Sequence, residues 1–128
     1  MAAVATYELG TPMENAKMLE AKTTTEQEAA ARALSVLLHF DGNRTLFKKE
    51  PKGILRTVQL LDPSSLNIDK KYPISILLSL SHNFKCKKQM IAAGACIHLE
   101  KLAELDCAAK KLLDCLQRGH LWNIFGRR

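Results

Sequence analysis

The stretch Ala33-Leu34-Ser35-Val36-Leu37 returns about 43 residues later as Ile76-Leu77-Leu78-Ser79-Leu80, with apolar and small residues in the same order. The match continues to His39 and His82. In both stretches the apolar residues recur at every third or fourth position, which is the spacing of a helix face. Self-similarity with this period is typical of helical repeat proteins, in which each unit buries its apolar face against its neighbours. The sequence therefore predicts an all-α fold.

Further helices are predicted on both sides of these two stretches. A second match, with a spacing of about 44 residues, pairs a helix that follows each of them: Leu55, Val58, Leu61 and Asp62 match Leu99, Leu102, Leu105 and Asp106. Gly42 is expected to end the helix that contains Leu34, and Gly119 to follow the last helix. The predicted helices cover residues 14–21, 27–40, 44–50, 54–61, 69–82, 84–92, 95–105 and 108–116.

Composition limits the class of protein. The chain has 128 residues, of which 47% are hydrophobic and 5% aromatic, enough for one helical domain with an aliphatic core. The net charge of +6 indicates either an acidic or polyanionic partner or a solvated basic surface. The four cysteines form no CxxC pair, so no zinc site is predicted, and their thiols fit a reducing cytoplasmic or nuclear setting. The longest apolar run, Ile74–Leu80, is too short to span a membrane.

Several stretches together resemble one family, the armadillo repeat. Asn43-Arg44-Thr45-Leu46-Phe47 and Lys87-Lys88-Gln89-Met90-Ile91-Ala92-Ala93-Gly94-Ala95 are similar to its first helices, and Ala29–Leu37 to a third helix. Val58-Gln59-Leu60-Leu61-Asp62-Pro63-Ser64 and Lys70-Lys71-Tyr72-Pro73 resemble the C-terminal repeats of plant armadillo proteins related to U-box ubiquitin ligases, although no U-box sequence is present.

The resemblance covers residues 26–118 and implies a short right-handed α-α superhelix, with about two full repeats plus flanking helices. Residues 1–25 are expected to be weakly structured or partly helical, and residues 119–128 to form a C-terminal tail. In the first repeat, Glu50 stands where the family has glycine, and Gly53 is displaced from that position.

In armadillo proteins the third helices line a concave groove, where some members carry an asparagine and a tryptophan that hold an extended peptide. Matching the leucine pattern places the asparagine positions at Val36, Ser79 and Cys115, and the tryptophan positions at Arg32, Ser75 and Lys111. Since none of the six carries the family's residue, the resemblance does not imply a grip on basic peptides. Arg32 and Lys111 are expected to meet acidic side chains instead, the alternative being that these are ordinary solvated positions.

The tail contains the apolar group Leu121-Trp122-Asn123-Ile124-Phe125. Trp122 and Phe125 are expected to cap the last helices or, alternatively, to dock onto a partner, because both residue types are common interface anchors.

The function predicted from these features is non-catalytic protein–protein recognition, without a metal or another cofactor. The sequence contains neither of the glycine-rich phosphate-binding motifs GxxxxGK(S/T) and GxGxxG. His39 and His82 recur with the repeat, which favours a structural role over catalysis. Two alternatives remain open. One is a nucleic-acid-binding module, because basic pairs recur at Lys48-Lys49, Lys70-Lys71, Lys87-Lys88 and Lys110-Lys111. The other is a fragment of a larger armadillo adaptor or ligase, whose open N-terminal face would self-associate.

Overall fold

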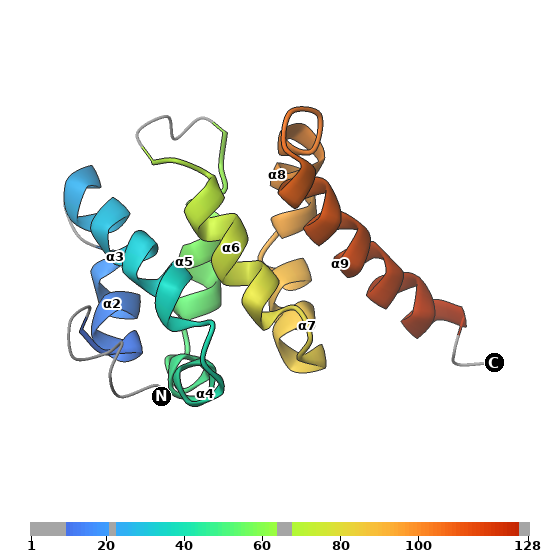
Figure 1. The fold of residues 1–128 in the computed structure, drawn as a ribbon. Coiled ribbons are helices and arrows are strands. Elements are labelled where there is room, and N and C mark those ends of the chain that lie inside the picture. The colour runs from blue at the N-terminus through green and yellow to red at the C-terminus, as the bar shows by residue number, and fades with distance from the viewer. Residues whose placement is uncertain (1–9, 21–22, 64–67, 126–128) are drawn as a thin grey trace.

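The structure, a computed structural model, describes residues 10–20, 23–63 and 68–125, with side chains as far as Arg118 (Figure 1). Within these ranges it consists of eight α-helices and contains no strand, which confirms the prediction of an all-α fold. The helices are α2 (Pro12–Met18), α3 (Thr24–Leu37), α4 (Asp41–Lys48), α5 (Gly53–Gln59), α6 (Lys71–Leu80), α7 (Phe84–Ala92), α8 (Ala95–Leu102) and α9 (Cys107–Phe125).

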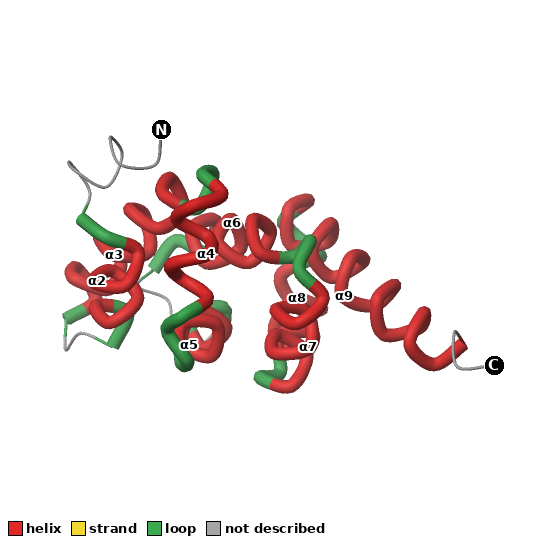
Figure 2. Tube along the Cα trace, turned by 90° about the horizontal axis from the view of Figure 1, so that it is seen from below, coloured by secondary structure: helices red, strands yellow, loops and turns green. Residues whose placement is uncertain are grey.

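The helices α3, α6 and α9 form a row across the molecule. Helix α3 packs against α6, and α6 packs against α9, although these helices are far apart in the sequence (Figure 1). The shorter helices α5, α7 and α8 lie on one side of this row (Figure 2). At the N-terminal end, α2 packs against both α3 and α4, while α8 packs against α9.

One apolar core runs along this row. Leu34 of α3, Leu77 of α6 and Leu113 of α9 are all buried and belong to the same cluster of core residues. Phe47 of α4 and Met90 of α7, which occupy matching places in the two units, are both fully buried in that cluster. The matched residues Leu34 and Leu77 are thus both core residues, each in a helix of the row.

Side chains at the helix starts explain why several helices begin where they do. The Thr23 hydroxyl accepts a hydrogen bond from the Glu26 amide at 3.2 Å, and Asn83 caps α7 by accepting one from the Cys86 amide at 3.0 Å. Asp106 accepts from the Ala108 amide at 2.8 Å at the start of α9. Between α7 and α8, Gly94 has a φ of 89°, a left-handed conformation that favours glycine.

The junction between α3 and α4 differs from the prediction. Helix α3 ends at Leu37, and Gly42 lies inside the first turn of α4 rather than ending the preceding helix. The carbonyls at the end of α3 accept hydrogen bonds from the turn and from α4: the Phe40 amide and Asn43 Nδ2 donate to the Leu37 carbonyl at 3.2 and 3.0 Å, and Arg44 donates to the Leu38 carbonyl at 2.8 Å. With these carbonyls paired, the turn needs no left-handed glycine.

The predicted spacing of about 44 residues between the second helices is wrong. Leu55 is 43% exposed whereas its supposed match Leu99 is fully buried, and Leu105 is 97% exposed. The buried positions correspond at a spacing of about 41 residues, so that Val58 matches Leu99. In this register Gly53, which begins α5 against the buried ring of Phe47, matches Gly94 and is not displaced. The spacing shortens because the connection between α4 and α5, residues 49–52, is longer than the one between α7 and α8, residues 93–94, so the match between the two aspartates was misleading.

The C-terminal region also differs from the prediction. Helix α9 continues through Gly119 to Phe125, so the expected end near Leu116 is wrong. A glycine inside a helix costs only about 1 kcal/mol relative to alanine, which good helix formers such as Leu116 and Gln117 can offset. The side chains of Trp122 and Phe125 lie outside the described part of the chain, and so does the choice between capping and docking.

Candidate partner-binding groove

A cavity of about 430 Å³ opens where α3, α6 and α9 come together. We call it the α6–α9 groove. Helix α6 supplies most of its wall, α9 supplies the opposite side, and one residue after α3 closes the end. The described residues that line it are His39, Ser75, Leu78, Ser79, Ser81, His82, Lys111, Cys115 and Arg118.

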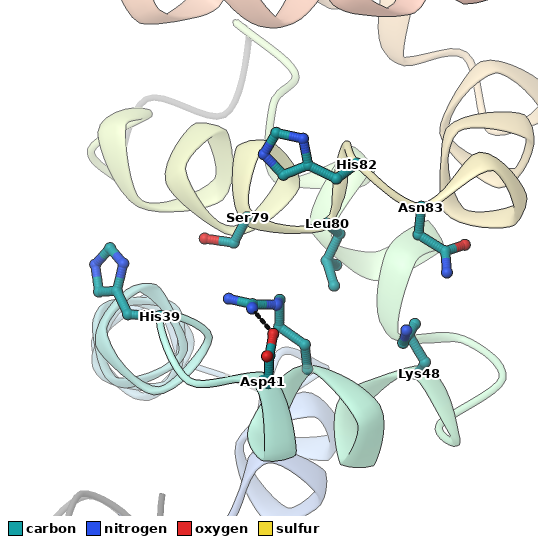
Figure 3. A pocket seen from close by; sticks show the side chains of 8 residues that line it. His39, Asp41, Lys48, Ser79, Leu80, His82 and Asn83 are labelled. Carbon is teal, nitrogen blue, oxygen red and sulfur yellow. Dashed lines mark hydrogen bonds and ion pairs between the residues drawn. The ribbon is translucent and has the colours of Figure 1, made fainter. Parts of the chain in front are cut away.

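A second hollow of about 530 Å³, the α4–α6 pocket, adjoins the groove and shares His39, Ser79 and His82 with it. Figure 3 shows His39 and Ser79 on the two sides of the gap between α3 and α6. The α4–α6 pocket is completed by Asp41, Arg44, Lys48, Leu80 and Asn83. Because three residues are common to both hollows, they form one continuous depression along the ends of α3 and α6.

Basic side chains dominate this depression. Lys48, Lys111 and Arg118 are exposed to solvent. Arg44 is held in place, because its guanidinium donates to the Leu38 carbonyl and pairs with Asp41 (Figure 3). Among the described lining residues, Asp41 is the only carboxylate, so the depression carries an excess of positive charge.

Hydrogen bonds within the helices orient the polar side chains of the groove. The Ser79 hydroxyl donates to the Ser75 carbonyl at 3.0 Å, and the buried Ser81 hydroxyl donates to the Leu78 carbonyl at 2.7 Å. On the opposite wall, Arg118 Nε donates to the Asp114 carbonyl at 3.5 Å. The Cys115 sulfur lies 4.0 Å from the Ser81 carbonyl, where α9 approaches α6. The walls of the groove are therefore built by regular helices rather than by loops.

Four of the six residues predicted for the groove meet here: Ser75, Ser79, Lys111 and Cys115. The other two, Arg32 and Val36, line a separate hollow of about 580 Å³ between α2 and α3, together with Met18. Val36 is 45% exposed and Met18 40% exposed in that hollow. Arg32 and Lys111 therefore do not face one site.

Sequence reasoning missed five of the nine residues that line the α6–α9 groove, and three of these five, His39, His82 and Arg118, can carry charge. His39 and His82 recur with the repeat and for that reason were assigned a structural role, but both are exposed and line the groove. Arg118 lies seven residues after Lys111, which is a helical spacing that places both on one face of α9. Recurrence with the repeat therefore does not place these two histidines in the core.

The perturbed ionisable groups lie away from the groove. Burial raises the pKa of the Cys86 thiol, with Lys48 acting in the opposite direction, and burial together with Glu100 raises the pKa of Cys96. Burial lowers the pKa of Lys70, against the opposing effect of Asp62; its ammonium donates to the Leu60 carbonyl at 2.7 Å. A raised thiol pKa disfavours the nucleophilic thiolate. The pKa shifts of Cys86, Cys96 and Lys70 therefore result mainly from burial in the fold.

Among the described residues, no group of three or more His, Cys, Asp and Glu side chains is placed to hold a metal ion. No helix in the described ranges combines the length and the apolar character needed to cross a bilayer. Comparisons of the chain with protein-family models, curated proteins and solved structures found no significant match. The groove and its chemistry are therefore the basis for a functional proposal.

Proposed function

We propose that the chain is a non-catalytic protein-binding module of the armadillo type, which binds an acidic segment of a partner protein along the α6–α9 groove. The observation that carries the proposal is the composition of the depression: several cations and hydrogen-bond donors converge there, and the one described carboxylate, Asp41, is paired with Arg44. Acidic side chains would find complementary charge in it.

The order of the helices supports the armadillo part of the proposal. Two successive units each consist of two short helices and a longer one: α4, α5 and α6 have 8, 7 and 10 residues, and α7, α8 and α9 have 9, 8 and 19 residues. The longest helix of each unit lies in the row that begins with α3. A relationship to the plant armadillo proteins associated with U-box ligases belongs to the same proposal and rests on the sequence resemblance.

A protein partner is favoured over nucleic acid by what lines the groove. Proteins that bind single strands usually offer aromatic rings on which the bases stack. The described residues of the α6–α9 groove and the α4–α6 pocket include no Phe, Tyr or Trp. One of the basic pairs is also partly engaged within the fold, because Lys70 donates to the Leu60 carbonyl. A cytoplasmic or nuclear location, inferred from the unpaired cysteines, is part of this proposal.

The test measures binding of fluorescent peptide pools, either rich in Glu and Asp or rich in Lys and Arg, by anisotropy. The acidic pool is expected to bind, and Lys111→Glu and Arg118→Glu each to weaken binding by about tenfold, since reversing a charge at a complementary surface replaces attraction with repulsion. Lys101→Glu is the matched control, because Lys101 is exposed on α8 and outside the groove. Arg32→Glu is also expected to bind normally, because Arg32 lines the other hollow.

An equal loss in all four variants would indicate a general effect of net charge and would contradict the groove. Tighter binding of the basic pool would contradict the acidic partner.

A further inference from the structure

Resting on the proposed function, we infer that the α6–α9 groove is a phosphoryl-binding site, and that the partner segment it recognises carries a phosphorylated side chain. Three features of the groove support this site: the cations of α9, the polar side chains that face them and the charge of the lining.

The first feature is the placement of two cations on one face of α9. Lys111 and Arg118 are separated by two helical turns, with Cys115 between them, and all three line the groove. Side chains on a helix lean toward its N-terminus, as the bond from Arg118 Nε to the Asp114 carbonyl at 3.5 Å shows, so Lys111 and Arg118 lean in the same direction. Their long stems, rather than this lean, allow both charges to reach a ligand in the groove. The two cations can therefore approach one anion from both ends of the groove.

The second feature is the set of donors opposite α9. Ser75 and Ser79 are one turn apart on the wall formed by α6, and His82 follows the end of that helix. His39, which follows α3, closes the groove from the third side. Opposite the two cations of α9, polar side chains thus come from α6 and from the residues that follow α3 and α6; the Ser79 hydroxyl, which donates to the Ser75 carbonyl, would turn away from that carbonyl to reach a ligand. A phosphoryl group offers three strong acceptor oxygens in a tetrahedral arrangement and can use such donors, whereas a carboxylate offers two oxygens in one plane.

The third feature is charge. The described lining of the α6–α9 groove contains no carboxylate, and the nearest one in the depression, Asp41, pairs with Arg44 in the neighbouring pocket. A phosphorylated side chain carries about 1.5 to 2 negative charges near neutral pH, against one for Glu or Asp. Lys111 and Arg118 together match that charge. The groove, of about 430 Å³ and open to solvent, also has room for a phosphorylated side chain.

The experiment compares three pools of short acidic peptides that are identical except for a central phosphoserine, glutamate or serine. The phosphoserine pool is expected to bind about five- to tenfold more tightly than the glutamate pool, since charge-assisted hydrogen bonds to an additional oxygen are strong. Lys111→Gln and Arg118→Gln should each reduce that advantage to less than about twofold. Lys101→Gln, outside the groove, should leave the advantage intact. Both groove residues are exposed, so circular dichroism is expected to show unchanged folding.

The outcomes separate this inference from the proposed function. Equal binding of the phosphoserine and glutamate pools would overturn the phosphoryl site while leaving the acidic partner in place. Failure of all three pools to bind would contradict both. A single-stranded RNA that displaces the phosphoserine pool at lower concentration than unlabelled peptide would overturn the inference in favour of nucleic acid.

A second measurement is independent of the peptide sequence. In ¹⁵N–¹H spectra, O-phosphoserine is expected to shift the backbone amides of Ser79, His82 and Cys115, while O-methylserine leaves them unchanged. Phosphate-dependent shifts confined to residues outside the groove would overturn the site.

Discussion

A single buried amide determines how α3 and α4 meet. The Asn43 side chain is 1% exposed and donates to the Leu37 carbonyl at 3.0 Å, while its neighbour Arg44 donates to the Leu38 carbonyl. At the corresponding junction in the next unit, Asn83 instead caps the start of α7. Two units with the same helix order thus use different residues at the same joint. The end of α3 was misplaced because Gly42 was interpreted as the residue that ends the helix, whereas it lies in the first turn of α4.

Replacing Asn43 with alanine is expected to reduce the free energy of unfolding by about 0.5–1.5 kcal/mol, because the Leu37 carbonyl would lose the hydrogen bond from this side chain and keep only the one from the Phe40 amide. Urea denaturation measures the effect. Thr45→Ala is the matched control in the same helix, since the exposed Thr45 hydroxyl donates only within α4, to the Asp41 carbonyl. Equal losses in the two variants would show that the amide does not hold the junction.

At the scale of helices, the recurrence of apolar residues at every third or fourth position predicted the helices better than the distance between matching stretches predicted their register. The bounds of α7 follow directly from its apolar positions and from the glycine after it, and the row of α3, α6 and α9 follows from the match between Leu34 and Leu77. The predicted spacing of about 44 residues between α5 and α8 was wrong, because connections of unequal length shift the register between the two units. The chance match of Asp62 with Asp106 hid this shift in the sequence comparison. Only four of the nine residues that line the α6–α9 groove were predicted. Helical spacing identifies the residues on one face of a helix, but it does not identify the neighbouring helix that packs against that face.

Helix α9 gives a direct test of one of these differences. Because Gly119 lies in the interior of α9, Gly119→Ala is expected to raise the free energy of unfolding by about 0.5–1 kcal/mol, through alanine's higher helix propensity. If the helix instead ended near Leu116 with Gly119 in a left-handed turn, as the sequence pattern predicts, alanine would be strained there and stability would fall. Thermal unfolding followed at the helical circular dichroism band distinguishes a rise from a fall.

At the scale of the whole molecule, α6 connects the two ends, because it packs against both α3 and α9. Its central residue Leu77 is fully buried in the common core. Leu77→Ala is expected to cost about 2–5 kcal/mol and to lower the stability of the whole chain in one transition. Leu105→Ala, at a position that is 97% exposed, is the control and should change stability by less than about 0.5 kcal/mol. Two separate transitions in the Leu77 variant would show that the ends fold independently.

The stability of the whole chain should also depend on pH in the alkaline range, through Cys86. Burial raises the pKa of this thiol above its ordinary value of 9.0, so the folded state keeps a proton that the unfolded state releases. The associated stability is fully present below pH 9.0 and is lost as pH rises through the raised pKa. Cys96 acts in the same direction, whereas Lys70, with a pKa lowered from 10.5, costs stability that is regained as pH rises toward 10.5.

Cys86→Ala isolates the first of these effects, because it removes one titrating thiol and leaves Cys96 and Lys70 in place. Denaturation at a series of pH values from 8 to 10.5 is expected to show a shallower loss of stability with pH for Cys86→Ala than for the unchanged chain. The comparison uses slopes, because removing the buried sulfur also lowers stability by a constant amount at every pH. Cys107→Ala, at an exposed position, is the control for the general effect of losing a cysteine. A slope unchanged by Cys86→Ala would mean that Cys86 exchanges protons as freely in the folded chain as in the unfolded one, and would contradict its burial in the core on the inner face of α7.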